Sequence, residues 1–290
     1  MKLVKRCIRW EHQSYRQKLI YYRLATVLAN LICLIPLPIA WLFRFFGSDK
    51  DREGDHLYGT TYGTILRRFR YRRIKLLEIG IGGYGTGLGG SSLLAWQAFF
   101  PFAKIVACDI VPKADLETWR IRIYTVDQSS PTDLARLIKE QAPFDIVIDD
   151  GSHQNSHQIF TFSQLFDSIN DGGIYIIEDV QTSFWPGSVG LYTGLGAGRA
   201  RDHSGRGYTY DGRHINDPEF SQTCVGSFLE LAKYLNYQEF LDNESIDARK
   251  LSLAKNIKRI SFEHNLIIVD KGPNNAPSRG RCTICSKAAR

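Results

Sequence analysis

The sequence predicts an α/β protein with a doubly wound, mainly parallel sheet. Short apolar runs of strand length alternate with segments of helical length through the middle of the 290-residue chain. Two of these apolar runs end in pairs of acids, and another leads directly into a glycine-rich turn. In an open α/β sheet the carboxyl ends of the strands form the ligand-binding edge, so these features predict a functional site there.

The expected elements follow from this alternation, and no internal repeat interrupts it. A late pair of apolar runs joined by Glu263, His264 and Asn265 predicts a closing antiparallel hairpin. The expected strands are 75–79, 104–109, 122–126, 145–149, 173–178, 257–262 and 266–271, and the expected helices are 64–72, 91–99, 131–140, 153–168 and 220–240. The expected domains are a short basic, apolar helical arm (1–46), a linker or lid with a helix (47–73), a catalytic domain (74–272) and a disordered basic tail (273–290).

The net charge of +7 arises mainly from basic clusters near both ends of the chain and before the first strand. No nucleic-acid motif lies beside these clusters and the middle of the chain is not basic, so nucleic acid is not an expected partner. The six cysteines are mostly scattered, which indicates a reducing compartment and a cytoplasmic location. Cys282 and Cys285 form one CxxC pair, and a zinc site would need a second pair.

An uncharged apolar run extends from Leu24 to Phe43 and is long enough to be considered as a membrane span. Pro36 and Pro38 argue against one continuous helix. No small-residue cleavage site follows, so a signal peptide is not expected. Three alternatives stay open: two short helices packed on the body or on a sister subunit, a peripheral membrane contact through 24–46, and a true span.

The two acid pairs are the strongest chemical signal in the chain. If the runs before them are neighbouring strands, about 4.8 Å apart, four carboxyl groups gather at one rim of the sheet. Such crowding raises carboxyl pKa values unless a cation is present, so a bound metal is the simplest resolution. Helix caps or solvated turns are the plain alternative. The four acids are Asp149, Asp150, Glu178 and Asp179.

His153 follows Asp150 by three residues and is a potential proton acceptor beside this metal. It falls at the start of the expected helix, with Ser152 as the N-cap. His157, one helical turn later, competes for the role of base. Asp149 points to the opposite face of its strand from Asp150, so we count it with the cofactor-binding residues, or as an orienter of the ligands, rather than as a ligand.

The glycine-rich turn after the first strand favours S-adenosylmethionine as cofactor. Glycines there let the backbone approach a ligand closely. Asp109, at the end of the second strand, can hydrogen-bond ribose hydroxyls. Asp127 and Gln128, after the third strand, could contact the edge of an adenine ring. Glu78 suits a cationic amino acid better than a pyrophosphate, and no Lys or Arg lies within the turn, which argues against a nicotinamide cofactor or a nucleoside triphosphate. The glycines expected to contact the cofactor are Gly80, Gly82 and Gly83.

Six runs together resemble the metal-dependent sugar O-methyltransferases of macrolide tailoring, the mycinamicin and macrocin type, and more distantly the cephalosporin-hydroxylase-like and catechol-type methyltransferases. The runs are LEIGIGGYGTGLGGSSLLAW, VACDI, VDQSS, FDIVIDDGSH, GGIYIIEDVQTSFWPG and FEHNLIIVDKG. The resemblance covers roughly 47–272. It implies a class I methyltransferase (Rossmann-like) fold, S-adenosylmethionine as methyl donor, Mg²⁺ as metal and a glycosylated small molecule as acceptor. The short arm stands where those enzymes carry a larger auxiliary domain.

The resemblance also implies roles for particular residues. Asp150, Glu178 and Asp179 would hold the metal, His153 would act as general base, and the 80–83 turn with Asp109 and Gln128 would hold the cofactor. A long segment rich in glycine, tyrosine and arginine, 186–218, is expected to be a substrate loop, and Trp185 and Tyr192 stack on a sugar ring or simply pack. The competing hypotheses are a membrane-associated scaffold protein without turnover and a metal-dependent hydroxylase or hydrolase. A homo-oligomer is a further expectation.

Overall fold

The structure is a computed structural model that describes residues 13–54, 56–83, 87–184, 200–201, 208–209, 218–240 and 246–275. The chain divides into two compact units, Met1–Ser152 and His153–Arg290. Several sequence predictions fall outside the described residues. These are the basic positions of 1–12, Trp185, Tyr192, most of the expected substrate loop, and the tail after 275 with Cys282 and Cys285.

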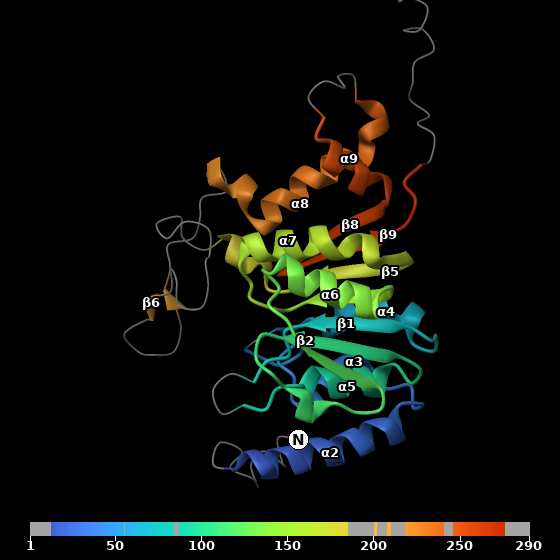
Figure 1. The fold of residues 1–290 in the computed structure, drawn as a ribbon, viewed down its shortest axis with the longest axis vertical. Coiled ribbons are helices and arrows are strands. Elements are labelled where there is room, and N and C mark those ends of the chain that lie inside the picture. The colour runs from blue at the N-terminus through green and yellow to red at the C-terminus, as the bar shows by residue number, and fades with distance from the viewer. Residues whose placement is uncertain are drawn as a thin grey trace, which may run out of the picture. The chain divides into compact units, whose positions relative to one another are not determined.

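Four parallel strands form the centre of the first unit (Figure 1). Strand β1 lies between β2 and β4, with Ile79 beside both Cys108 and Asp149, and β3 lies on the far side of β2. The glycine turn after β1 and the acid pair at the end of β4 therefore emerge next to each other. The bounds are β1 Lys75–Ile79, β2 Lys104–Asp109, β3 Ile121–Thr125 and β4 Phe144–Asp149, with helices α5 Ser91–Phe99 and α6 Pro131–Gln141.

The local sequence explains these elements. Ile146, Val147 and Ile148 are fully buried, as expected for a parallel strand covered on both faces. Helix α6 begins after Ser130, whose hydroxyl accepts a hydrogen bond from the Asp133 amide, and Pro131 occupies its first turn, where no amide donor is needed. The expected strands of this unit and its expected helices 91–99 and 131–140 agree with the observed ones to within about a residue at each end.

The apolar run near the N-terminus forms two helices, α2 (Tyr15–Ile32) and α3 (Ile39–Phe46). Ser14 and Gln17 form a capping box at the start of α2, and the chain breaks before α3 at Pro36 and Pro38, as the prolines predict. Both helices pack against α5 of the same unit (Figure 1). No helix in the described part of the chain is both long and apolar enough to span a membrane.

The segment expected to be a polar linker or lid instead contains fully buried side chains, among them Lys50, Asp51 and Tyr62. The helix expected over 64–72 also begins earlier, because helix α4 covers Gly59–Leu66 and a short 3₁₀ turn covers Arg67–Phe69. The rings of Phe43, Tyr62 and Trp96 pack edge to face, which joins α3 and α4 to α5.

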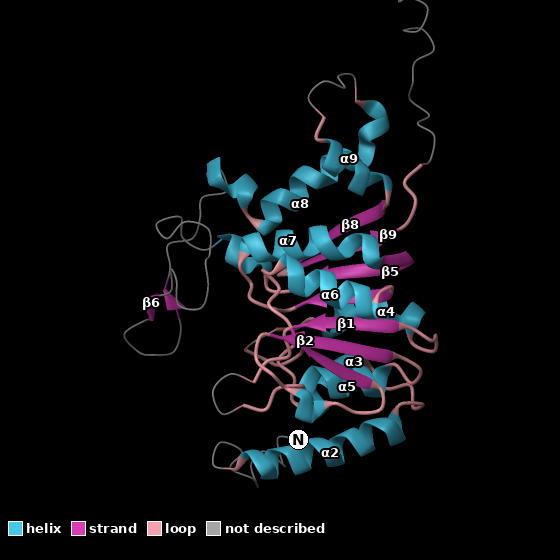
Figure 2. Cartoon of the chain, viewed as in Figure 1, coloured by secondary structure: helices cyan, strands magenta, loops and turns pink. Residues whose placement is uncertain are grey.

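The described part of the second unit contains antiparallel strands and the helices α7, α8 and α9 (Figure 2). Strand β9 pairs with β5 on one side and β8 on the other, so the predicted closing hairpin is confirmed. The helix predicted from 153 begins only at Asn155, and its N-cap is Gln154 rather than Ser152. The bounds are α7 Asn155–Leu165, β5 Ile169–Ile177, α8 Cys224–Lys233, α9 Ala248–Lys255, β8 Ile257–Glu263 and β9 Leu266–Lys271, with the short strands β6 Ala200–Arg201 and β7 Tyr208–Thr209.

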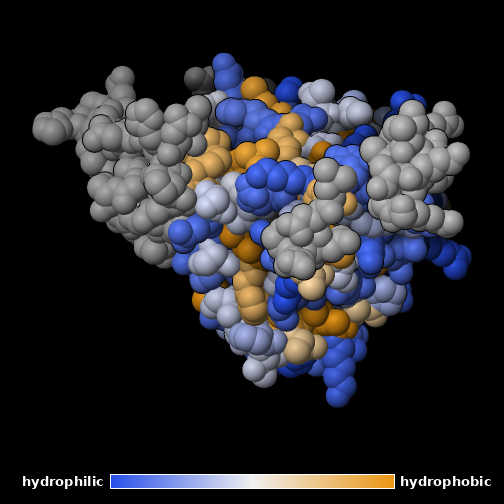
Figure 3. All heavy atoms as spheres, turned by 90° about the horizontal axis from the view of Figure 1, so that it is seen from above, coloured by the Kyte–Doolittle hydropathy of each residue, from blue (hydrophilic) through white to orange (hydrophobic). Residues whose placement is uncertain are grey.

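The strand order is β3-β2-β1-β4 in the first unit and β5-β9-β8 in the second. Strands β1 to β4 run parallel and the C-terminal pairs run antiparallel, so the predicted fold class is confirmed. The face seen in Figure 3 carries hydrophilic residues interspersed with hydrophobic ones.

Candidate functional site

Gln128 joins the ends of β3 and β4. Its side-chain amide donates to Asp149 Oδ1 at 3.1 Å, and its Oε1 accepts a hydrogen bond from the Ser152 amide at 2.6 Å. A Cβ at position 151 would lie 1.9 Å from that Oε1, which explains the glycine there. Two predicted cofactor residues, Gln128 and Asp149, are thus in direct contact, and both are buried.

A buried lysine lies between the carboxylates that end β1 and β4. Lys50 Nζ lies 2.5 Å from Asp150 Oδ2 and 3.4 Å from Glu78 Oε1, while the Ser92 hydroxyl donates to Glu78 Oε2 at 2.9 Å. Burial raises the pKa of Glu78, and the Lys50 ammonium lowers it only in part. Sequence analysis missed Lys50, because a lysine between two aspartates in a turn-rich segment has the pattern of solvated surface.

The glycine turn is shaped by close backbone contact. Gly80 has φ +79°, and a Cβ there would lie 2.0 Å from the backbone oxygen of Asp150. Gly83 has φ +88°, and its Cβ would lie 2.5 Å from the Gly89 amide nitrogen. Gly82 has φ +64°, yet a Cβ there would meet nothing within 4 Å. The turn therefore packs on β4 through Gly80 and leaves open space at Gly82.

A cavity of about 420 Å³ opens beside this turn, within the first unit. This volume falls in the range of small-molecule sites. Among the predicted site residues its lining includes Gly82, Gly83 and Asp150, whereas Glu78 lies behind Ser92 rather than in the wall. A part of the wall that the sequence did not predict comes from α2, the end of α3 and the turn after it: Tyr21, Tyr22, Ala25, Phe46, Gly47, Ser48, Asp49 and Arg52.

The two other predicted cofactor residues are held locally. Asp109 accepts hydrogen bonds from the Ile81 amide at 3.1 Å, the Val111 amide at 2.9 Å and Lys113 Nζ at 2.7 Å, which fixes its carboxylate against the glycine turn. The Lys113 ammonium also contacts the Gly82 carbonyl. Asp127 accepts from the amide and hydroxyl of Ser129, so its carboxylate shapes the turn before α6.

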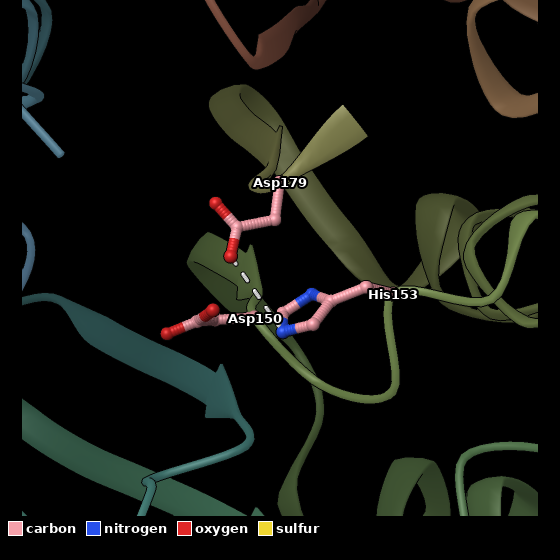
Figure 4. A group of neighbouring side chains, drawn as sticks. All are labelled: Asp150, His153 and Asp179. Atoms are coloured by element: carbon pink, nitrogen blue, oxygen red, sulfur yellow. Dashed lines mark ion pairs between the residues drawn. The ribbon is translucent and has the colours of Figure 1, made fainter. Parts of the chain in front are cut away.

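In the second unit, His153 Nε2 lies 3.6 Å from Asp179 Oδ2, so the two side chains form an ion pair whenever the imidazole is protonated (Figure 4). Each residue has a positive φ, +57° and +56°. The candidate metal ligands form a group of three, which are His153 and Asp179 of this unit and Asp150 of the first. Glu178, the remaining predicted ligand, is buried and lies outside this group, and its backbone carbonyl accepts a hydrogen bond from Gln158 at 2.9 Å.

The donor chemistry of this group suits a hard divalent cation. The two carboxylates supply the oxygen ligands that Mg²⁺ prefers, whereas an imidazole nitrogen suits softer transition metals. The chemistry therefore favours the aspartates as metal ligands and leaves the His153 imidazole nitrogen available for proton transfer. The open space at Gly82 beside a cavity of suitable size likewise fits a cofactor that approaches the turn backbone.

Comparison with known proteins agrees with this chemistry, although no family model matches the chain. The chain is 33% identical over 221 residues to mycinamicin VI 2''-O-methyltransferase of Micromonospora griseorubida, covering 76% of this chain and 49% of that protein. It is 34% identical over 223 residues to demethylmacrocin O-methyltransferase of Streptomyces fradiae, covering 76% and 50%. The MycE methyltransferase structure in complex with Mg, SAH and mycinamycin VI matches with a TM-score of 0.68 and 29% identity, over 86% of this chain and 58% of that one.

The fold is that of a class I methyltransferase. The similar sequences are sugar O-methyltransferases, and the chain spans about half the length of these curated relatives. In the class I methyltransferase fold described here, chain order reverses between β1 and β4, and open α/β sheets bind ligands at such a switch point. The glycine turn, Asp150 and the cavity all lie at that point of the first unit.

Proposed function

We propose that the chain is an S-adenosylmethionine-dependent, Mg²⁺-dependent O-methyltransferase that acts on a sugar hydroxyl of a glycosylated small molecule. One observation carries the proposal: Asp150, a candidate metal ligand, lines the cavity at the glycine turn of the first unit. A single side chain thus connects the space for a methyl donor with a candidate metal site. The sugar O-methyltransferase relatives support the choice of acceptor class.

In this proposal the 80–83 turn, Asp109 and Gln128 hold the cofactor, with Asp149 fixed by Gln128. Asp150 and Asp179 hold the metal, with Glu178 as a weaker third ligand. When bound, S-adenosylmethionine supplies an activated methyl group and Mg²⁺ lowers the pKa of the acceptor hydroxyl.

His153 then has one task, which is to remove the proton from that hydroxyl. Its Nε2 faces Asp179, so a protonated imidazole gains an ionic partner as it forms. The buried Lys50 holds Asp150 at the cavity edge, and it keeps Glu78 from facing Asp150 as an uncompensated charge. Position and orientation should supply most of the rate, because the methyl donor is already activated.

The test is methyl transfer from labelled S-adenosylmethionine to a panel of glycosides and catechols, with and without a chelator. Label is expected in a glycoside only when Mg²⁺ is available, and S-adenosylhomocysteine is expected to raise the melting temperature of the protein. No thermal protection by the cofactor would instead favour the scaffold hypothesis. Turnover that needs Mg²⁺ but leaves the label on the donor would favour the hydroxylase or hydrolase.

A further inference from the structure

Gln158 is a glutamine on helix α7 of the second unit, and its side chain is only 1% exposed. Its side-chain amide donates a hydrogen bond to the Glu178 carbonyl at 2.9 Å, just after the end of β5. Its Oε1 has no hydrogen-bond partner among the described residues. Because an unpaired buried amide oxygen costs free energy, glutamine is a poor choice here for packing alone. The bond to the Glu178 carbonyl is the feature that a glutamine adds.

That carbonyl belongs to the peptide group directly before Asp179. Asp179 has φ +56°, in the left-handed region that is costly for a residue with a side chain. The orientation of the preceding peptide plane helps to set this φ, because the backbone turns only about the bonds on either side of each rigid peptide group. A flip of the plane would release Asp179 into an ordinary conformation, but it would also turn the Glu178 carbonyl away from Gln158. The Gln158 hydrogen bond therefore opposes the flip.

The chain after Asp179 is held as well. The Val180 amide donates to the Asn265 carbonyl at 3.3 Å, which fixes the peptide group that follows Asp179. Further along, the Ser183 hydroxyl donates to Asn155 Oδ1 at 2.9 Å. Asn155 is fully buried and lies on α7 three positions before the glutamine, so both amides share one face of the helix. Asp179 thus has a held peptide group on each side, and contacts within the second unit set its backbone conformation.

His153 lies two residues before the start of α7, and its Nε2 is 3.6 Å from Asp179 Oδ2 (Figure 4). We propose that Gln158 is a positioning residue, which fixes the peptide group before Asp179 and so holds the Asp179 carboxylate where it faces His153 and can bind a divalent cation. The inference rests on the proposed function, because the roles of Asp179 and His153 come from there. Ligand groups have to be held to within about 0.5 Å, so a looser Asp179 should bind a cation less well.

The test is titration calorimetry of the full chain with Mg²⁺ for the wild type and for variants of one residue. Gln158→Met removes the amide donor and keeps the length of the side chain. It should weaken Mg²⁺ binding by roughly tenfold, the lower end of the effect of a partner outside the ligand set. Gln158→Ala removes the same donor without adding volume, and it gives the same comparison if methionine does not fit. Gln158→His is the rescue variant and should bind Mg²⁺ nearly as well as the wild type, because an imidazole Nε2–H can donate at a similar reach.

Gln164→Met is the matched control on the same helix. The Gln164 amide donates to the neighbouring Ser163 hydroxyl at 3.3 Å, so this variant should keep the wild-type affinity for Mg²⁺. Affinity for S-adenosylhomocysteine should not change in any variant, because the proposed cofactor residues lie in the first unit. A lower melting temperature of Gln158→Met with unchanged Mg²⁺ affinity would mean that Gln158 only stabilises the unit, and the proposal would be wrong.

A crystal structure of Gln158→Met gives a readout that needs neither metal nor turnover. Asp179 is expected to leave the left-handed region, and an unchanged φ at Asp179 would contradict the proposal. The calorimetry separates this inference from the proposed function. A wild type that binds Mg²⁺ and transfers methyl groups, with a Gln158→Met variant of equal affinity, would overturn the inference alone. A wild type that binds no Mg²⁺ would overturn the metal-dependent function and the inference with it.

Discussion

His153 and Asp179 face each other across 3.6 Å while both hold a left-handed backbone conformation. Non-glycine residues in that region cost about 1–3 kcal/mol each, and they persist when the surroundings fix them. His and Asp tolerate it better than most residues, so the cost here lies toward the lower end. The chain accepts this strain at the two positions whose side chains meet, which favours a functional role for the pair.

Replacement of His153 by Asn should remove the base and keep the backbone, because Asn tolerates the left-handed region. Turnover is expected to fall by about 10²–10⁴-fold, the usual contribution of a general base. Affinity for S-adenosylhomocysteine, measured by calorimetry, should not change. His157→Asn is the matched control and should keep its rate. A wild-type rate in His153→Asn, or a collapse in His157→Asn, would reassign the base.

Asp150→Asn and Asp179→Asn should each weaken Mg²⁺ binding by about 100-fold or more, since even partners outside the ligand set are worth about 10–100-fold. Glu178→Gln should cost less, because Glu178 lies outside the group of three. Titration calorimetry with Mg²⁺ measures all three, and Asp167→Asn, an exposed acid of the second unit, is the control. An equal loss in Glu178→Gln would make it a full ligand, whereas no loss in Asp150→Asn would remove Asp150 from the site.

Lys50→Met should destabilise the chain by roughly 3 kcal/mol, because it leaves the buried Glu78 facing Asp150 without their shared cation. The double variant Lys50→Met/Glu78→Gln should recover part of that loss, since one of the two carboxylates is then neutral. Urea unfolding gives the free energies, and Lys139→Met, at an exposed position on α6, should change them little. Additive losses in the double variant would mean that Lys50 and Glu78 do not interact.

The glycine turn allows a comparison of two positions with the same substitution. Gly82→Ala should lower the free energy of unfolding by about 1–2 kcal/mol, the cost of a positive φ for alanine, because its Cβ meets no atom within 4 Å. Gly80→Ala adds a collision with the Asp150 backbone at 2.0 Å, so it should lose more stability and displace the end of β4. Denaturant unfolding measures the difference. Equal losses of stability in Gly80→Ala and Gly82→Ala would show that the glycine turn does not pack tightly against the end of β4.

The buried Glu78 should make the free energy of unfolding depend on pH. Its pKa in the folded chain lies above the ordinary value of 4.5, mainly because it is fully buried. Between those two pKa values the folded state keeps a proton that the unfolded state has released, so the free energy of unfolding falls as pH rises through that window. Glu78→Gln should lack this fall. Unfolding by urea at pH values from below to well above 4.5 would reveal it, and parallel curves would contradict it.

The sequence was sufficient for most of the sheet, because parallel strands such as Ile146–Ile148 are continuous apolar runs with sharp ends. It was also sufficient for placing Asp149 and Asp150 beside the glycine turn, since register follows once β1 and β4 are neighbours. It failed where the signal depends on distant contacts. Ser152 has the composition of an N-cap, but its amide bonds to Gln128 and the helix begins later at Asn155. The residues next to Lys50 in the sequence do not indicate that it lies buried between the carboxylates of Glu78 and Asp150.

Helix α2 supplies a wall of the cavity and lies well before β1. Truncation to 74–272, the part of the chain with all the predicted chemistry, would keep every candidate ligand and the base, yet it would remove Tyr21, Tyr22 and Ala25 and uncover the apolar surface of α5. Any shortened version for crystallography or engineering therefore has to start at or before Ser14, the cap of that helix.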